Sequence, residues 1–343
     1  MAEVTRFFHP VLGAGRLGRR PVRVLLDEKP YVLFRDGTGQ PAALRDACPH
    51  RLAPLSAGRV RPDGRLECVY HGWHFDAAGR GCSPTQPTLT RCDVESFQVV
   101  ERLGYLWMAS RETPRDAFPT VNWDGFEFAG AYSVRFQAPL HVCLDNFSED
   151  EHVPFVHTRL GFDRKDLERV EFRADNFDDR TEVHYRAPQR STRMLPFILL
   201  RHGDVFHNDW VTRFDPVHSV YTIWWTDPSG NPRPFVTRAA IFMVPETART
   251  TWFHVFSYVE LADARFQLIK PMVKALAVIL GRLEVMDDAR FIPTVADTPV
   301  SMKGMRLGKY DKPLIHNRKL LQRIYRGTGD DDLSSVPHLT VVQ

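Results

Sequence analysis

The chain has little net charge, few cysteines and no long hydrophobic segment. Its formal net charge is +3 over 343 residues, and it has no basic block with interleaved aromatic residues, so we expect no nucleic-acid partner. Five cysteines, an odd number in a long chain, argue against a disulfide framework and indicate a reducing compartment. The longest apolar run, Met272–Leu283, contains Lys274 and Arg282 and is too short to span a bilayer. We therefore expect no integral membrane segment, and a buried or partner-facing helix over this run.

The chain also has little that indicates a signal peptide or a nucleotide site. Its first 15 residues contain an early acid and no long apolar core, which predicts a cytoplasmic protein without a signal peptide. Residues 13–18 read GAGRLG and fit G-x-G-x-x-G, but we expect no strand before them, and Arg19, Arg20 and Pro21 follow where a helix would begin. We expect a loop there, so nicotinamide or flavin chemistry has to come from another protein.

Length and apolar patterning predict two domains. The hydrophobic content of 43% and the charged content of 25% are those of an ordinary globular protein, and the length suits about two domains. Short apolar runs alternate with turns over residues 21–46, and further runs follow at 97–101 and 105–109, which predicts a small all-β domain. The segment 111–125 is rich in proline and charge and is expected to be a linker or the first turn of the next domain. We place the domains at residues 1–112 and 113–343.

A metal-binding pattern stands inside the first domain. Cys48 and His50 are two residues apart, 17 residues follow, and Cys68 and His71 are three apart. Two cysteines and two histidines can bind zinc tetrahedrally, although zinc fingers usually pair cysteine with cysteine and histidine with histidine. One cysteine and one histidine in each half suit a two-iron cluster in which one iron takes both thiolates and the other both imidazoles.

The residues around this pattern carry a family resemblance. The segments CPHR and CVYHGWHFD resemble the two cluster-binding loops of the Rieske iron–sulfur family, over about residues 45–84. The resemblance implies that Cys48 and Cys68 hold one iron and that His50 and His71 hold the other. Such a cluster carries electrons but does no substrate chemistry alone, so a second site is expected in the rest of the chain.

The segment 141–157, HVCLDNFSEDEHVPFVH, contains several acids and two histidines five residues apart. On one continuous helix His152 and His157 would point about 140° apart and could not share a metal ion. We expect Pro154 to end the helix near His152, so that the chain turns and brings His157 back to the same point. Glu149, three residues before His152, is expected on the same face of that helix.

This arrangement resembles the mononuclear-iron motif of Rieske oxygenases, an acid three residues before the first of two histidines. The resemblance implies that His152 and His157 bind Fe(II), with a carboxylate from a late helix as the third ligand. Asp288, followed by Ala-Arg-Phe-Ile, fits the family pattern better than Asp287 does, and the alternative is that both are surface acids. Two histidines and one carboxylate leave positions open for dioxygen and substrate.

The chain departs from the family at one position. The family usually has aspartate where this chain has Glu149, and there the acid links the iron's histidine to a cluster histidine of a neighbouring subunit. Asp150 stands beside Glu149 and could take that role instead, although the register favours Glu149. Asn146 is a further candidate to support the ligands, or else it lies on a helix surface.

The rest of the chain predicts a sheet and a helix. Strand-like runs follow one another over residues 173–260 and precede the apolar run that ends at Leu283. This suits an antiparallel sheet over a long helix, as in the helix-grip catalytic domain of the family, and the fold class is α+β. We leave His202 and His207 as polar sheet or pocket residues. Several aromatic residues of these strands should face either the core or an apolar pocket: Phe206, Trp210, Trp224, Trp225 and Phe242.

The resemblance implies the terminal oxygenase component of a Rieske non-haem iron oxygenase, of the single-chain, monooxygenase-like branch. Such a protein is a homotrimer that uses O2 and electrons from NAD(P)H, relayed by a flavin reductase with or without a ferredoxin. The expected reaction is hydroxylation or oxidative dealkylation of an apolar or aromatic small molecule. N-oxygenation of an arylamine and desaturation are alternatives at the same iron, and the basic segment 308–327 is weakly similar to the aminopyrrolnitrin oxygenase branch.

Two alternatives come from other classes of protein. A Rieske electron carrier without oxygen chemistry would bind the cluster and no second iron. A zinc-stabilised binding module would be colourless and contain no labile sulfide.

Overall fold

The computed structural model describes residues 4–89, 92–157, 159–191, 200–261, 264–302 and 304–328, with the side chains of 264–266 left out. The described residues divide into two compact units, with the boundary between Pro119 and Thr120 and with Val244–Thr247 grouped with the first unit. This boundary lies within the segment 111–125 that the sequence predicts to be a linker.

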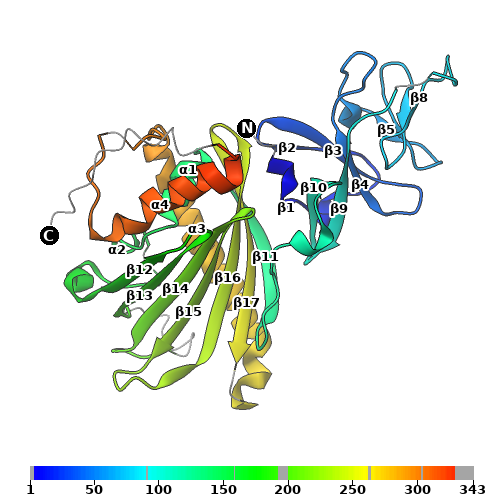
Figure 1. The fold of residues 1–343 in the computed structure, drawn as a ribbon. Coiled ribbons are helices and arrows are strands. Elements are labelled where there is room, and N and C mark those ends of the chain that lie inside the picture. The colour runs from blue at the N-terminus through cyan, green and yellow to red at the C-terminus, as the bar shows by residue number, and fades with distance from the viewer. Residues whose placement is uncertain are drawn as a thin grey trace. The chain divides into compact units, whose positions relative to one another are not determined.

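The first unit is built of two small sheets (Figure 1). Its short 3-10 helices are η1 (Val4–Arg6), η2 (Ala14–Arg16), η3 (Leu55–Ala57) and η4 (Arg115–Ala117). The larger sheet has the order β1 (His9–Gly13), β10 (Tyr105–Ser110), β9 (Ser96–Arg102), β4 (Pro41–Arg45), β3 (Lys29–Arg35) and β2 (Val22–Leu26). The smaller sheet has the order β5 (Arg59–Val60), β6 (Leu66–Glu67), β7 (His74–Phe75) and β8 (Gly81–Cys82).

The Gly-rich segment 13–18 differs in part from the expectation. A strand, β1, does precede it, because the run His9–Gly13 pairs with β10. The residues after β1 form the single turn η2, and no α-helix begins there. A dinucleotide fingerprint needs a helix whose N-terminus faces the phosphates, so the segment lacks half of that motif.

The second unit is a seven-stranded sheet with helices packed on it (Figure 1). The order is β11 (Glu127–Phe136), β17 (Thr250–Leu261), β16 (Pro232–Thr247), β15 (Val217–Thr226), β14 (Val205–Phe214), β13 (Arg180–Pro188) and β12 (Glu171–Asn176). Its helices are α1 (Leu140–Asn146), α2 (Val153–Val156), α3 (Lys270–Phe291) and α4 (Lys312–Leu320). Shorter turns are η5 (Arg164–Arg169), η7 (Ala264–Ile269), η8 (Ile292–Val295), η9 (Lys309–Asp311) and the π-helical η10 (Leu321–Arg326).

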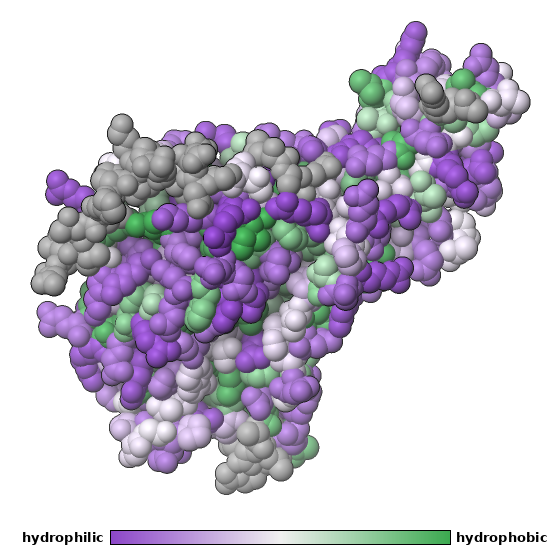
Figure 2. Space-filling model, viewed as in Figure 1, coloured by the Kyte–Doolittle hydropathy of each residue, from purple (hydrophilic) through white to green (hydrophobic). Residues whose placement is uncertain are grey.

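The long helix α3 packs against β11 and β17. It contains the apolar run that the sequence singles out, and Leu280 and Val285 are buried against the sheet. Met272 and Ile279 on the same helix are about half exposed, so the run is buried along one side only. No helix among the described residues is long and apolar enough to cross a membrane. On the face drawn in Figure 2, hydrophilic side chains predominate and hydrophobic ones form smaller groups.

Candidate metal centres

The two cluster loops share one backbone conformation. Cys48 follows β4 and Cys68 follows β6. In each loop the cysteine carbonyl accepts a hydrogen bond from the amide four residues on, Leu52 at 2.7 Å and Gly72 at 3.1 Å. These two residues have φ of +58° and +73°, the left-handed conformation that favours glycine. The sequence provides glycine in the second loop only, so the first loop holds a leucine in a strained conformation.

The four residues of the metal-binding pattern lie together at the ends of these loops. Cys48 and Cys68 are each 2% exposed, whereas His50 and His71 are exposed and their ring centroids are 4.5 Å apart. Burial and the neighbouring Cys68 raise the pKa of the Cys48 thiol to about 11, although the amides of His50 and Arg51 donate to its sulfur. Two adjacent buried thiols that both need to ionise suit a cationic metal centre, which deprotonates its thiolate ligands.

The second centre is assembled from two distant parts of the chain. His152 is the residue before α2, and His157 is the residue after it, in extended conformation. Asp288 lies on α3 and is 5% exposed at its side chain. Nε2 of His152 lies 3.3 Å from Nε2 of His157, and the two nitrogens lie 3.3 Å and 3.4 Å from Oδ1 of Asp288. The three ligand atoms therefore form a nearly equilateral triangle.

The local structure around the histidines corrects one expectation. Helix α1 ends at Asn146, so Glu149 and His152 do not share a helix face. Pro154 does not end a helix either, because it is the second residue of α2. Proline is tolerated in the first turn, where its missing N–H has no intrahelical partner. The single turn of α2 still brings His157 back beside His152, which is the outcome that the sequence predicts by another route.

Each ligand of the triangle has a supporting side chain. Nδ1 of His152 donates to Oε1 of Glu149 at 2.6 Å. Nδ1 of His157 lies 3.0 Å from Oε2 of Glu284, as an ion pair rather than an aligned hydrogen bond. The amide of Asn146 donates to Oδ1 of Asp288 at 3.2 Å. Because both Nδ1 atoms face carboxylates, both Nε2 lone pairs point toward the aspartate oxygen.

The triangle fits a divalent metal ion. Two imidazole lone pairs and a carboxylate oxygen repel one another at these distances unless a proton or a cation lies between them. Bonds of about 2.1 Å from one ion to neighbouring ligands at right angles would put the ligand atoms about 3 Å apart. The donor set of two histidines and one carboxylate is the one that non-haem Fe(II) sites use.

The electrostatics of the site favour positive charge at its centre. Burial works against a charged His152, but the carboxylates of Glu149 and Asp288 outweigh it and hold the pKa of His152 well above its usual value. For His157, burial is likewise outweighed by Asp288 and Glu284, which raise its pKa to about 9. The two histidines hold the pKa of the buried Asp288 carboxyl well below its usual range. A cation is stabilised here whether it is a proton or a metal ion.

Asp287 and Asp150, the alternatives to Asp288 and Glu149, have other partners. Asp287 binds Arg159 at 2.5 Å and Arg290 at 2.8 Å. Asp150 is 6% exposed and accepts a hydrogen bond of 2.9 Å from Asn208. Burial raises the pKa of the Asp150 carboxyl to about 6 despite that hydrogen bond. Asp288 is therefore the acid within 3.4 Å of both histidine Nε2 atoms, whereas Asp287 lies within 4.8 Å of His157 and is neutralised by two arginines. Glu149 rather than Asp150 is hydrogen-bonded to His152.

Helix α4 fixes the loop that carries Glu149 and His152. The guanidinium of Arg318 is 1% exposed, pairs with the Asp145 carboxylate and donates to the carbonyls of Pro299 and Val300. Asn317 donates to the hydroxyl of Ser148 at 2.8 Å. These contacts give a structural role to the basic segment 308–327, because they hold the end of α1 and the residues that follow it.

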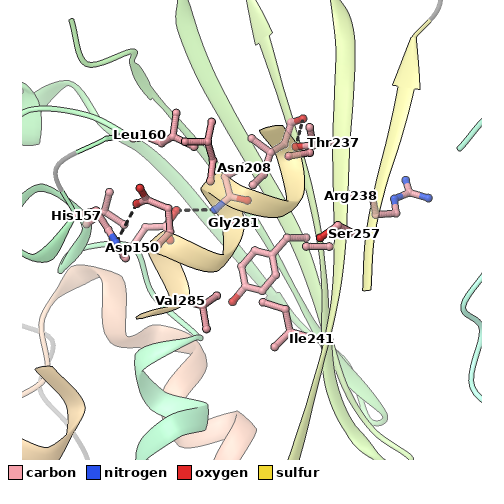
Figure 3. Close-up of a pocket in the computed structure, with 18 of the residues that line it drawn as sticks. Asp150, His157, Leu160, Asn208, Thr237, Arg238, Ile241, Ser257, Gly281 and Val285 are labelled. Atoms are coloured by element: carbon pink, nitrogen blue, oxygen red, sulfur yellow. Dashed lines mark hydrogen bonds and ion pairs between the residues drawn. The ribbon is translucent and has the colours of Figure 1, made fainter. Parts of the chain in front are cut away.

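A cavity of about 220 Å³ opens beside the triangle, between α3 and the sheet (Figure 3). All three triangle residues line it, and most of its remaining wall is apolar, as with Leu160, Phe206, Ile223, Trp225, Phe235 and Leu276. Gly281 of α3 leaves room there for the Tyr132 hydroxyl, which lies 3.2 Å from the position that a Cβ would take. A largely apolar cavity next to a metal site suits a small apolar substrate.

The aromatic residues of the strands divide between the cavity and the core. Phe206 and Trp225 line the cavity, whereas Trp210 and Phe242 are buried elsewhere. Trp224 is only partly buried and stacks on His207 with ring centroids 4.9 Å apart. His202 is exposed in a turn. Neither histidine lines the cavity as the described residues define it.

Two cavity residues that the sequence reasoning missed have recognisable signals. Glu284 stands four residues before Asp288, which puts both acids on one face of α3. Asn208 interrupts an alternating stripe on β14, where residues 206, 208, 210, 212 and 214 are buried and their neighbours are not. A polar residue in a buried stripe of this kind indicates either a polar network or a binding role.

Comparison with known proteins shows what the two units are similar to. The family model of the Rieske [2Fe-2S] domain matches residues 8–98. Protein TIC 55, chloroplastic, of Pisum sativum is 33% identical over 172 residues, which cover 47% of this chain and 31% of TIC 55. The oxygenase component of dicamba O-demethylase from Stenotrophomonas maltophilia is 27% identical over 249 residues, which cover 67% of this chain and 71% of that protein.

The fold has a solved counterpart. The crystal structure of dicamba monooxygenase bound to 3,6-dichlorosalicylic acid has a TM-score of 0.76 at 21% identity and covers 95% of this chain and 98% of that chain. This chain spans about a third or less of the length of the first curated relatives that it matches.

The first unit is thus a Rieske [2Fe–2S] domain, and the second has the sheet-and-helix fold of dicamba monooxygenase. The chain is thus similar to Rieske oxygenases over both units, and its two groups of ligands suit a [2Fe–2S] cluster and a mononuclear iron. These findings confirm the α+β class, with an all-β Rieske domain followed by a helix-grip unit.

Proposed function

We propose that this chain is the terminal oxygenase component of a Rieske oxygenase system that oxygenates an apolar or aromatic small molecule. The observation that carries the proposal is the triangle of His152, His157 and Asp288, whose ligand atoms lie 3.3–3.4 Å apart at the wall of an apolar cavity. A Rieske electron carrier would not need a second metal site such as this triangle. A module that zinc only stabilises would not need a metal site at the wall of an apolar cavity.

Seven residues would hold the two cofactors. The cluster would relay electrons, and the mononuclear iron would activate dioxygen. Cys48 and Cys68 would hold one cluster iron and His50 and His71 the other, while His152, His157 and Asp288 would hold the mononuclear iron. Glu149 and Glu284 keep Nδ1 of the two histidines protonated, so that Nε2 faces the metal position. The apolar wall of the cavity, with an apolar substrate against it, would limit the access of water to the reacting groups.

We propose Glu149 as the acid that connects the mononuclear site to the cluster of a neighbouring subunit in a homotrimer. Its Oε1 accepts from His152 at 2.6 Å, and its side chain keeps 13% of its surface exposed. Asp150 is turned inward to Asn208 and is less available. Electrons would come from NAD(P)H through a separate flavin reductase, with or without a ferredoxin.

The reaction that we propose is hydroxylation or oxidative dealkylation. One relative is named for O-demethylation of dicamba, and another is named methylxanthine N1-demethylase. These names support loss of a methyl group as the outcome to test first.

The test is metal content followed by turnover. Purified chain reconstituted under anaerobic conditions should contain about three irons and two labile sulfides. With NADH, a surrogate reductase and a panel of small aryl methyl ethers and N-methyl heteroarenes, it should consume O2 and release formaldehyde. Chain that holds two irons and never a third, or that consumes no O2 with any compound of the panel, would refute the proposal.

Glu284 offers a separate test of how the iron is held. Glu284→Gln removes the charge that faces Nδ1 of His157 and should lower iron affinity by roughly tenfold, measured by competition with a chelator. Glu127→Gln is the matched control, because Glu127 pairs with Lys270 at 2.5 Å and Lys274 at 2.8 Å and touches no triangle residue. Equal affinities in the two variants would show that Glu284 does not support His157.

A further inference from the structure

One buried amide oxygen at the cavity has no hydrogen-bond donor among the described residues. Asn208 lies in the middle of β14, is 6% exposed and lines the cavity (Figure 3). Its Nδ2 donates to Oδ2 of Asp150 at 2.9 Å. A carboxylate oxygen accepts and does not donate, so Asp150 fixes which way the amide points. The other atom, Oδ1, has no hydrogen-bond partner among the residues that the structure describes.

An amide oxygen buried in this way needs a donor. Nearly all buried carbonyl oxygens in folded proteins have a hydrogen-bond partner, and leaving one without a partner is unfavourable. Asp150 is two residues before His152, so the hydrogen bond to Asp150 ties Asn208 to the loop that carries the metal ligands. A ligand group that donates to Oδ1 would therefore be held at a fixed place relative to the triangle.

The charges around the cavity oppose an anionic ligand. Glu149, Asp150, Glu284 and Asp288 all line it, so even a bound divalent ion leaves an excess of negative charge. Among the described lining residues the single Lys or Arg is Arg238.

That guanidinium has its own partners. It lies over the rings of Phe126 at 4.1 Å and Trp123 at 5.1 Å, and it donates through Nε to Thr222 at 3.0 Å. In Figure 3 Arg238 points away from the helix that bounds the cavity. It is therefore not placed to pair with a carboxylate or sulfonate in the cavity.

We infer that Asn208 determines specificity by accepting a hydrogen bond from the substrate, and that the substrate is a small, uncharged aromatic or apolar molecule with an N–H or O–H group. The apolar body would lie against Phe206, Ile223 and Trp225, which line the same wall. The inference rests on the proposed function of the site, because it takes the cavity to be the substrate pocket.

Three probes of nearly the same shape test the inference by binding alone. Indole carries one N–H, benzothiophene replaces that N–H by sulfur, and indole-2-carboxylate adds an anion. Affinities are measured by calorimetry on the iron-loaded chain without O2 or reductase, so that no turnover occurs. Indole should bind about tenfold more tightly than benzothiophene, because the benzothiophene complex leaves Oδ1 of Asn208 without a donor. Indole-2-carboxylate should bind more weakly than indole.

Variants test whether the preference for indole over benzothiophene depends on Asn208. In Asn208→Leu, which replaces the amide by an apolar group of similar size, indole and benzothiophene should bind equally, and Asn208→Ala provides a second variant if the first folds poorly. Thr237→Val is the matched control, because Thr237 also lines the cavity and the change replaces its hydroxyl by a methyl group of similar size. The preference for indole should persist in Thr237→Val.

Each other outcome overturns the inference. Equal affinity of the unaltered chain for indole and benzothiophene, including no binding of either, would show that Oδ1 takes no ligand donor. Tightest binding of indole-2-carboxylate would refute the argument from charge, and a preference that survives in both Asn208 variants would assign it to another residue. Because binding is scored without turnover, an indole preference in a chain that consumes no O2 would refute the proposed function and leave the role of Asn208 standing.

Discussion

Asp288→Ala is expected to remove the mononuclear iron and all oxygenase turnover while leaving the cluster in place. Asp288 supplies one of three ligand atoms, and the remaining pair of histidines is not enough to hold Fe(II) against dissociation. Iron should fall from about three to about two per chain, with labile sulfide unchanged at about two. The Rieske absorption and electron paramagnetic resonance spectra should stay as in the unaltered chain.

The neighbouring acid provides the control. Asp287→Ala removes a carboxylate one residue away, but that carboxylate pairs with Arg159 and Arg290 and not with the triangle histidines. This variant should keep its third iron and most of its turnover. Loss of the third iron in Asp287→Ala with its retention in Asp288→Ala would show that Asp287, and not Asp288, is the third ligand. A chain that acts only as an electron carrier would show no functional difference between the two variants.

The elements that the sequence predicts well are those set by short-range spacing. The two cluster loops follow from pairs of residues two and three apart in the chain, and Gly72 with its φ of +73° marks the second loop. The strands over 205–261 follow from β-rich runs separated by turns, and α3 follows from its apolar run. Each of these depends on residues that are neighbours in sequence.

The route of the chain between Asn146 and His157 is less predictable. Helical spacing suggests that Glu149 and His152 share a helix, but α1 stops at Asn146 and α2 is a single turn. The reason is tertiary. Ser148 and Asp145 are held by Asn317 and Arg318 from α4, about 170 residues away in the chain, and these contacts override the local periodicity.

The polar residues of the cavity depend on sheet register. Asn208 faces the cavity because β14 lies between β13 and β15 with Asn208 opposite Tyr185 and Ile223. A slip of one residue would turn His207 to the cavity and Asn208 away from it. One sequence does not fix that register. The alternation along β14 was the one signal that could have indicated a buried polar residue at Asn208.

Glu149→Gln is expected to keep the mononuclear iron and to slow electron arrival by roughly ten- to a hundredfold. The carboxylate of Glu149 binds Nδ1 of His152 through Oε1 and the backbone amides of Glu151 and His152 through Oε2. A glutamine amide offers one acceptor and one donor, so it cannot satisfy both sides, and it removes the negative charge beside the imidazole. The measurement is the rate at which a pre-reduced cluster is reoxidised after mixing with O2 and substrate, with iron content assayed on the same sample.

Asp150→Asn tests whether slow electron transfer in Glu149→Gln comes from loss of the link between the two centres. The alternative is that removing any carboxylate near His152 has the same effect. Asp150 faces Asn208 and the cavity rather than His152, so its amide variant should leave the reoxidation rate nearly unchanged and alter substrate affinity instead. Slow reoxidation in Asp150→Asn together with a normal rate in Glu149→Gln would transfer the linking role to Asp150. Slow reoxidation in both would point to the charge of the loop as a whole, because the two carboxylates are adjacent and each acts on the field at His152.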